Sequence, residues 1–243
     1  MESVFLDVSG LSTSYKKFVV SNVSFKLSNG DILGLVGRSG SGKSTLIKTL
    51  IGLKRKNSGT AVVYVNSKKT SLLKVLGYSP QDNAIYPSLT VEENITTFAR
   101  LHNMKKKDYQ KQMNKILSRL DLQNSRKKRI NELSGGMQKR ADLAVTLIHN
   151  PKVLILDEPF TGLDISLQDF IWDFIRELSK EGKIIIVSSH NLSNLQKNCS
   201  RFGLIEGGLY YDNEKIMDYM KKSKDDLTQF LEKLFTRDLL SEK

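Results

Sequence analysis

The sequence predicts an α/β fold in which a mostly parallel sheet is flanked by helices. Residues 32–36 form an apolar run of strand length, and a glycine-rich turn and a helical pattern follow it directly. Two further short apolar runs, 153–156 and 183–187, are separated by a segment with apolar residues at helical spacing. Buried strands that alternate with helices are typical of a parallel sheet with helices on its faces.

The composition fits a single domain that spans residues 1–243. Hydrophobic residues make up 39% of the chain, which is enough to bury a sizeable core. The only cysteine, Cys199, excludes an intrachain disulfide and a cysteine-based metal site. No apolar run is long enough to span a membrane, and the N-terminus lacks the features of a signal peptide. We therefore expect a cytoplasmic protein.

The net charge of +12 comes partly from short basic runs such as 105–107 and 126–129. Most runs of this kind lie on solvated faces of helices and loops. Proximity to an anionic membrane is the second explanation, and nucleic acid is the last.

The N-terminal part of the chain contains short strand patterns and two polar residues of interest. Tyr15 is placed to stack on a purine base, although a partly buried tyrosine at a strand end is the simpler interpretation. Gln81 lies in an exposed turn, where a lone glutamine usually has no special role. The predicted strands are 4–8, 18–27, 61–65 and 75–78, with a turn at 29–31 that leads into the strand at 32–36.

The turn after residue 36 has the pattern G-x-x-x-x-G-K-[ST], which predicts a phosphate-binding loop. Its glycines allow successive backbone N–H groups to turn toward one anion, and the following helix points its positive end at the same place. Lys43 can neutralise the β- and γ-phosphates of ATP, and the Ser44 hydroxyl can bind Mg²⁺. The predicted ATP-binding residues here are Gly37, Arg38, Ser39, Gly40, Ser41, Gly42, Lys43, Ser44 and Thr45.

A helical region follows, which we expect to form a subdomain over residues 86–149. Apolar residues recur at helical spacing from residue 91 and again from residue 109. The region closes with Ser134, which can cap a helix, followed by Gly135 and Gly136, which allow close approach to a ligand. This is a second predicted anion-binding helix end. Ile85, Tyr86 and Leu89 could form a socket for a membrane partner, and packing inside the subdomain is the alternative interpretation.

Three polar residues follow the buried strands of the C-terminal half. Asp157 and Glu158 end the strand at 153–156, where Asp157 is expected to bind Mg²⁺ and Glu158 to polarise a water. His190 follows the strand at 183–187 and should lie at the same sheet edge. A strand pair is expected over 204–211, and an amphipathic helix over 226–240 lies within a C-terminal helical tail, 212–243.

Taken in this order, the motifs resemble the nucleotide-binding domain of ATP-binding-cassette (ABC) transporters over essentially the whole chain. The motifs that carry the resemblance are GRSGSGKST, the signature sequence LSGGMQKR and the acidic strand VLILDEP. The resemblance implies a P-loop NTPase core with an antiparallel β subdomain and an α-helical signature subdomain. Met137 and Ile165 depart from the common pattern, but neither change removes a catalytic group.

The resemblance also assigns roles to single residues. It implies that Tyr15 stacks on adenine, that Gln81 lies near Mg²⁺ and the attacking water, and that His190 senses the γ-phosphate. Asp164 would couple two sites across a dimer, and the segment Ser134, Gly135 and Gly136 would contact ATP held by the other subunit. Glu158, His190 and Gln81 are thus the expected catalytic residues, and Ser44, Gln81 and Asp157 the expected metal ligands.

Within the family, the sequence favours an exporter-type ATPase subunit. Its expected partners are a second copy or a paralogous ATPase, and a separate membrane permease that would hold it on the cytoplasmic face of the membrane. A soluble ABC ATPase that acts on nucleic acid or ribosomes is the alternative, and the sequence disfavours it because no coiled coil, zinc cysteines or second cassette is present. The intact Glu158 and His190 disfavour a regulatory module without turnover.

Overall fold

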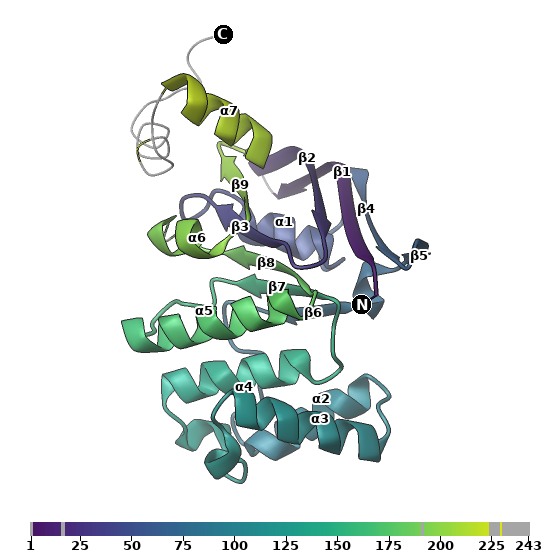
Figure 1. Ribbon diagram of the computed structural model, residues 1–243, viewed down its shortest axis with the longest axis vertical. Coiled ribbons are helices and arrows are strands. Elements are labelled where there is room, and N and C mark those ends of the chain that lie inside the picture. The colour runs from purple at the N-terminus through teal and green to yellow at the C-terminus, as the bar shows by residue number, and fades with distance from the viewer. Residues whose placement is uncertain (1, 16–17, 191, 224–228, 230–243) are drawn as a thin grey trace.

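The computed structural model describes residues 2–15, 18–190, 192–223 and 229, and contains one mixed sheet with helices on both faces (Figure 1). Along the sheet the strand order is β5-β4-β1-β2-β10-β9-β3-β8-β7-β6. The strands are β1 (Val4–Tyr15), β2 (Phe18–Ser28), β3 (Ile32–Val36), β4 (Ser58–Val65), β5 (Lys68–Thr70), β6 (Leu76–Ser79), β7 (Val153–Asp157), β8 (Ile184–Ser188), β9 (Arg201–Glu206) and β10 (Leu209–Tyr211). The α-helices are α1 (Lys43–Leu50), α2 (Val91–Leu101), α3 (Lys106–Arg119), α4 (Gly135–Leu147), α5 (Ile165–Lys180), α6 (Leu192–Asn198) and α7 (Asn213–Ser223), and short 3₁₀ helices cover Leu72–Lys74, Gln123–Ser125 and Ile130–Glu132.

The predicted parallel sheet is confirmed in β9, β3, β8, β7 and β6, which are paired in parallel. Every residue of β3, β7 and β8 is buried, as the continuous apolar runs in the sequence indicate. Side chains alternate between the two faces of the sheet. Ile155 packs in the same core as α1, whereas Leu154 and Leu156 pack in the core that contains α5. The carboxyl ends of the parallel strands therefore meet at one edge between these layers.

The N-terminal strands form an antiparallel wing beside the parallel core. In this wing, β1 pairs with β2 and β4, and β4 pairs with β5. The strand predicted at 4–8 is too short, because β1 continues to Tyr15. Gly10 adopts a left-handed φ of 59° in the irregular segment between Val8 and Leu11, so the strand passes through a bulge instead of ending in a turn. Buried side chains resume beyond it at Leu11 and Thr13.

The helices α2, α3 and α4 lie together at one end of the molecule, next to α5 (Figure 1), and α4 also packs against β6. The N-terminus of α2 is a capping box, in which the Thr90 N–H donates to Glu93 Oε2 at 2.8 Å and the Glu93 N–H donates to Thr90 Oγ1 at 3.2 Å. We keep 86–149 as the proposed extent of this helical subdomain. In the predicted tail, α7 covers Asn213–Ser223, and the helix expected over 226–240 lies outside the described residues except at residue 229.

Of the three residues predicted to form an apolar socket for a membrane partner, not all are exposed. Ile85 is buried in the core of the helical region, so this part of the expectation was wrong and the packing alternative holds for it. Leu89 is half-buried, and Tyr86 alone of the three is exposed, with its ring 6.3 Å from that of Phe98. The turn residues 85–89 fold back onto α2 because the buried Asn94 side chain bonds both the N–H and the carbonyl of Tyr86.

Two stacked histidines join the ends of α2 and α4. The rings of His102 and His149 lie 3.7 Å apart and nearly parallel. The Nε2 atom of His149 is 2.9 Å from the carbonyl oxygen of Leu76, so Nε2 carries the proton, while Nδ1 is buried with no partner among the described residues. Burial, and to a smaller extent the neighbouring His102, lower the pKa of His149 to about 4.

We expect the protein to lose stability in mild acid because of His149. Its pKa is lower in the folded state than in the unfolded state, so the neutral form stabilises the fold above pH 6.5, and this contribution is lost as the pH falls toward 4. Urea titrations should show the unfolding free energy falling by roughly 2 kcal/mol more in the wild type than in His149→Gln over this range. Equal slopes for wild type and His149→Gln would rule out this origin of acid sensitivity.

Candidate nucleotide-binding site

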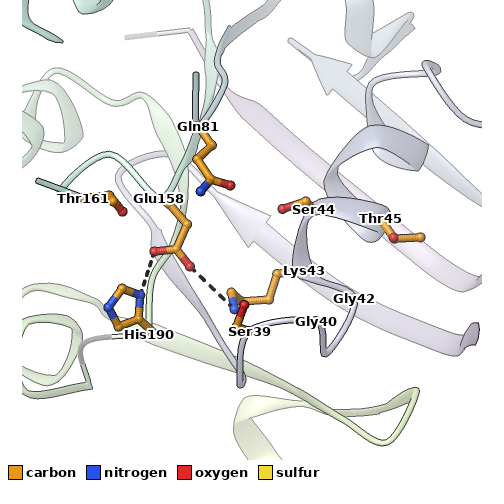
Figure 2. Close-up of a pocket in the computed structure, with 10 residues that line it drawn as sticks. All are labelled: Ser39, Gly40, Gly42, Lys43, Ser44, Thr45, Gln81, Glu158, Thr161 and His190. Atoms are coloured by element: carbon orange, nitrogen blue, oxygen red, sulfur yellow. Dashed lines mark hydrogen bonds and ion pairs between the residues drawn. The ribbon is translucent and has the colours of Figure 1, made fainter. Parts of the chain in front are cut away.

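A cavity of about 440 Å³ lies at the edge where the parallel strands end. The loop after β3, the turn after β6, the turn after β7 and the segment after β8 all contribute side chains to it. Figure 2 shows Gln81, Glu158 and Lys43 projecting into the same space. The lining residues are Ser39, Gly40, Gly42, Lys43, Ser44, Thr45, Gln81, Glu158, Thr161 and His190, and we call this space the loop cavity.

The backbone of the predicted phosphate loop has the expected conformation. Gly40 and Gly42 have left-handed φ values of 81° and 109°, and Gly42 is the N-cap of α1. A Cβ atom at Gly37 would lie 2.4 Å from the carbonyl oxygen of Ile205, so only glycine fits there. The N-terminus of α1 opens into the loop cavity, which fits an anion such as a phosphate.

Lys43 is buried at the bottom of the loop cavity. Its ammonium group donates to the carbonyl oxygens of Gly37 at 2.7 Å and Arg38 at 3.1 Å, and lies 3.5 Å from Glu158 Oε1. These contacts hold a positive charge beside the helix N-terminus. Together with the hydroxyls of Ser44 and Thr45, it provides the charge and the donors that a triphosphate requires.

Glu158 lies between Lys43 and His190. Its Oε2 atom is 3.1 Å from His190 Nδ1, and its backbone adopts a left-handed φ of 48°. The Glu158 N–H donates to Ser188 Oγ at 2.8 Å, and Ser188 donates in turn to Asp157 Oδ1 at 2.6 Å. The turn after β7 therefore directs Glu158 into the loop cavity, whereas Asp157 is fixed against β8. An unusual φ on a non-glycine residue is a feature often found at functional sites.

The structure brings most of the predicted site residues together, with some differences of detail. Asp157 is buried behind the loop cavity and does not line it, and Gly37, Arg38 and Ser41 shape the loop without lining it. Ser41 Oγ is buried with no partner among the described residues. Tyr15 ends β1, and its stacking on adenine stays a prediction.

Sequence reasoning missed Ser188 and Thr161. Ser188 connects Asp157 to the Glu158 backbone, and Thr161 lines the loop cavity. Ser188 is the last residue of β8, directly beside the carboxyl end of β7. Small hydroxyl residues in such positions carry no distinctive spacing, so only the register of the two strands reveals the contact.

The second predicted helix end lines a different cavity. Ser134 caps α4 by accepting from the Met137 N–H at 3.3 Å, and Asp164 caps α5 by accepting from the Leu167 N–H at 2.9 Å. Ser134, Gly136 and Asp164 line a separate cavity of about 430 Å³ and take no part in the loop cavity. Gly135 has open space beside it. We call Ser134, Gly135 and Gly136 the signature end of α4.

Comparison with known proteins connects this geometry to a family. Residues 20–161 match the family described as ABC transporter, and this match covers more than half of the chain. The chain belongs to the ABC transporter family. It is 35% identical over 207 residues to the Nod factor export ATP-binding protein I of Rhizobium etli, covering 84% of this chain and 66% of that protein. It is 34% identical over 196 residues to the linearmycin resistance ATP-binding protein LnrL of Bacillus subtilis, covering 79% of this chain and 63% of that protein.

The ABC transporter fold is also seen in solved structures. A structure described as the ATP binding subunit of an ABC transporter has a TM-score of 0.82 to this chain at 24% identity, over 95% of this chain and 99% of the other. The predicted P-loop NTPase core is thereby confirmed. The alternative of an ABC ATPase that acts on nucleic acid or ribosomes finds no support in these relatives. Among the described residues, no helix has the length and apolar character that a membrane crossing requires.

Proposed function

We propose that this chain binds and hydrolyses ATP in the loop cavity and thereby powers an ABC transporter. The observation that carries the proposal is the row Lys43, Glu158 and His190 at the N-terminus of α1, in which the Glu158 carboxylate lies 3.5 Å from the Lys43 ammonium and 3.1 Å from His190 Nδ1. A cation beside a helix N-terminus binds phosphates, and a carboxylate held at the same place can accept a proton from an attacking water.

Each residue then has a distinct task in hydrolysis. Lys43 holds the β- and γ-phosphates through charge-assisted hydrogen bonds. Glu158 accepts the proton of the attacking water, and His190 orients the Glu158 carboxylate through Nδ1. Mg²⁺ bound with ATP supplies positive charge at the phosphate oxygens, and Ser44, Gln81 and Asp157 are the residues that would hold it, Asp157 from behind the cavity. The oxygen donors of these three side chains suit this ion.

The assembly we propose contains two ATPase subunits and a separate permease. The signature end of α4 is a capped helix N-terminus that lines a cavity separate from the loop cavity of its own chain. A second subunit, either another copy or a paralogue, would present this end to the ATP of the first. The permease would carry the substrate across the membrane and hold this ATPase at the cytoplasmic face. No described helix of this chain is long and apolar enough to cross the membrane itself.

Export is the direction that we propose. Relatives that match most of this chain are named for Nod factor export and for linearmycin resistance. A cell can become resistant to a toxic compound by exporting it. The chain spans 66% and 63% of the length of these two relatives. The activity and the substrate of a whole transporter are therefore proposals for this chain.

Replacing Lys43 with alanine should weaken ATP binding by about 100-fold, because a buried charged contact to the phosphates is lost. Titration of the purified chain with a fluorescent ATP analogue and Mg²⁺ measures this affinity, and phosphate release measures turnover. Lys48→Ala is the matched control, because Lys48 lies on the same helix, is exposed and does not line the loop cavity. Unchanged affinity in Lys43→Ala, or a wild-type chain that releases no phosphate from ATP, would contradict the proposed function.

A further inference from the structure

A buried ion pair on α4 faces the turn that carries Gln81. Asp142 is fully buried and Lys139 is nearly so, and the two lie one helical turn apart. The Lys139 ammonium is 3.6 Å from Asp142 Oδ2. Neither residue lines the loop cavity or the cavity at the signature end. The roles proposed above for the site therefore leave this pair without a function.

The pair binds the Gln81 turn on both sides. On the N-terminal side, Ser79 Oγ donates to Asp142 Oδ2 at 2.5 Å, and Lys139 donates to Ser79 Oγ at 3.2 Å and to the Pro80 carbonyl at 3.3 Å. On the C-terminal side, the Ala84 N–H donates to Asp142 Oδ1 at 2.8 Å. Residues 79 and 84 are thus fixed to the two oxygens of one carboxylate, with Gln81 between them.

Stability alone does not account for such an arrangement. Burying two charges has a desolvation cost that often cancels their attraction, and apolar residues of similar size usually stabilise a core as well or better. Burial lowers the pKa of Lys139, and the nearby Asp142 opposes this shift. What a fully hydrogen-bonded buried pair does provide is one defined geometry. Here the geometry that it defines is the position of the Gln81 turn relative to α4.

The same helix begins at the signature end. Lys139 lies about one and a half helical turns after Ser134, so the pair and the signature end belong to one rigid helix. A displacement of this helix therefore moves the Gln81 turn with it. In the proposed dimer, the signature end contacts the partner's nucleotide while Gln81 contacts its own.

We propose that Asp142 and Lys139 are positioning residues that set Gln81 in the loop cavity according to the position of α4. This inference rests on the proposed function. The pair does not touch the nucleotide, and it acts through Gln81 by fixing the backbone at Ser79, Pro80 and Ala84. Its loss leaves the phosphate loop intact, so it affects kcat rather than ATP affinity.

Asp142→Asn tests the proposal by kinetics. This substitution removes the charge with little change of shape, and we expect kcat to fall about tenfold while equilibrium ATP binding changes by less than about twofold. In a Gln81→Ala background the same substitution should lower kcat by less than about twofold, because the residue through which it acts is already gone. Equal fold losses in both backgrounds would overturn the proposal and leave Asp142 with a purely structural role.

Thr146→Val is the matched control. Thr146 lies one turn further along α4 and donates to the Asp142 carbonyl and the Tyr78 carbonyl, so this variant removes a buried contact between α4 and β6 without touching residues 79–84. It should keep the wild-type kcat even where its Tm falls as far as that of Asp142→Asn. A tenfold loss of kcat in Thr146→Val would show that any weakening of this region has the same effect, and would contradict the proposal.

Hydrogen exchange gives a readout that does not depend on ATP hydrolysis. The Ala84 amide should exchange at least about tenfold faster in Asp142→Asn than in the wild type, because its acceptor loses its charge. Ser79→Ala deletes another contact of the pair and keeps both charges, so it should raise the exchange rate at Ala84 by a smaller factor. It replaces Asp142→Asn in this test if that variant does not fold. Unchanged exchange at Ala84 in both variants would overturn the inference. A wild type without ATPase activity would refute only the proposed function.

Discussion

Glu158→Gln should lower the turnover of ATP by a factor between about 100 and 10,000, which is about 3 to 5 kcal/mol of activation free energy. The amide keeps the size and shape of the carboxylate but cannot accept the proton of the attacking water. ATP binding should be retained or strengthened, because Lys43, which lies 3.5 Å from Glu158 Oε1, no longer has an anionic neighbour that competes with the phosphates. Single-turnover phosphate release and equilibrium ATP binding measure the two quantities separately.

Two comparisons make this result specific to Glu158. Glu181→Gln alters a carboxylate on the surface at the end of α5 and should keep wild-type turnover. His190→Gln should reduce turnover as well, because Glu158 loses the group that orients it. Turnover of Glu158→Gln within a factor of about three of the wild type would mean that another group is the general base.

A mixture of Lys43→Ala and Ser134→Arg subunits should regain the ability to trap ATP that each variant lacks alone. If each ATP is shared between the loop cavity of one subunit and the signature end of another, the mixed dimer has both lesions in one site and an intact second site. Arginine at residue 134 places a bulky side chain at the end that would face the phosphates. Trapping of labelled ATP by separately tagged subunits, purified through both tags, measures the intact site directly.

The steady-state rate of the mixture gives a second figure. With random pairing at equal amounts, about half of the dimers are mixed and each keeps one of two sites, so independent sites predict about one quarter of the wild-type ATPase rate. Strict cooperativity between the sites would lower this rate without preventing trapping. Mixed dimers that form but trap no ATP would contradict a shared site between two copies of this chain. The same experiment with a paralogous ATPase subunit from the same genome would then show whether the partner is a paralogue.

Much of the fold could be predicted because its signals are local. The continuous apolar runs of β3, β7 and β8 indicated buried parallel strands, and the glycine spacing of residues 37–42 indicated the loop that follows β3. Polar side chains that directly follow such strands meet at one edge of the sheet, so the sequence predicted correctly that Glu158 and His190 lie close to Lys43.

Other features depend on contacts between distant segments, which the sequence does not reveal. Ile85 stands in an exposed turn pattern, yet it is buried because Asn94 draws the turn onto α2. Asp142 lies in a helix pattern where an acidic residue suggests a solvated face, and only the position of β6 beside α4 shows that it binds the Gln81 turn. The extension of β1 beyond residue 8 depended on a bulge at Gly10, which has no distinctive spacing.

The most direct test of the central claim is a crystal structure of Glu158→Gln with ATP and Mg²⁺. The account predicts a dimer in which the γ-phosphate lies in the loop cavity of one subunit, against Lys43, and is covered by Ser134, Gly135 and Gly136 of the other. ATP bound outside the loop cavity, or bound there with the signature end of the second subunit elsewhere, would contradict it.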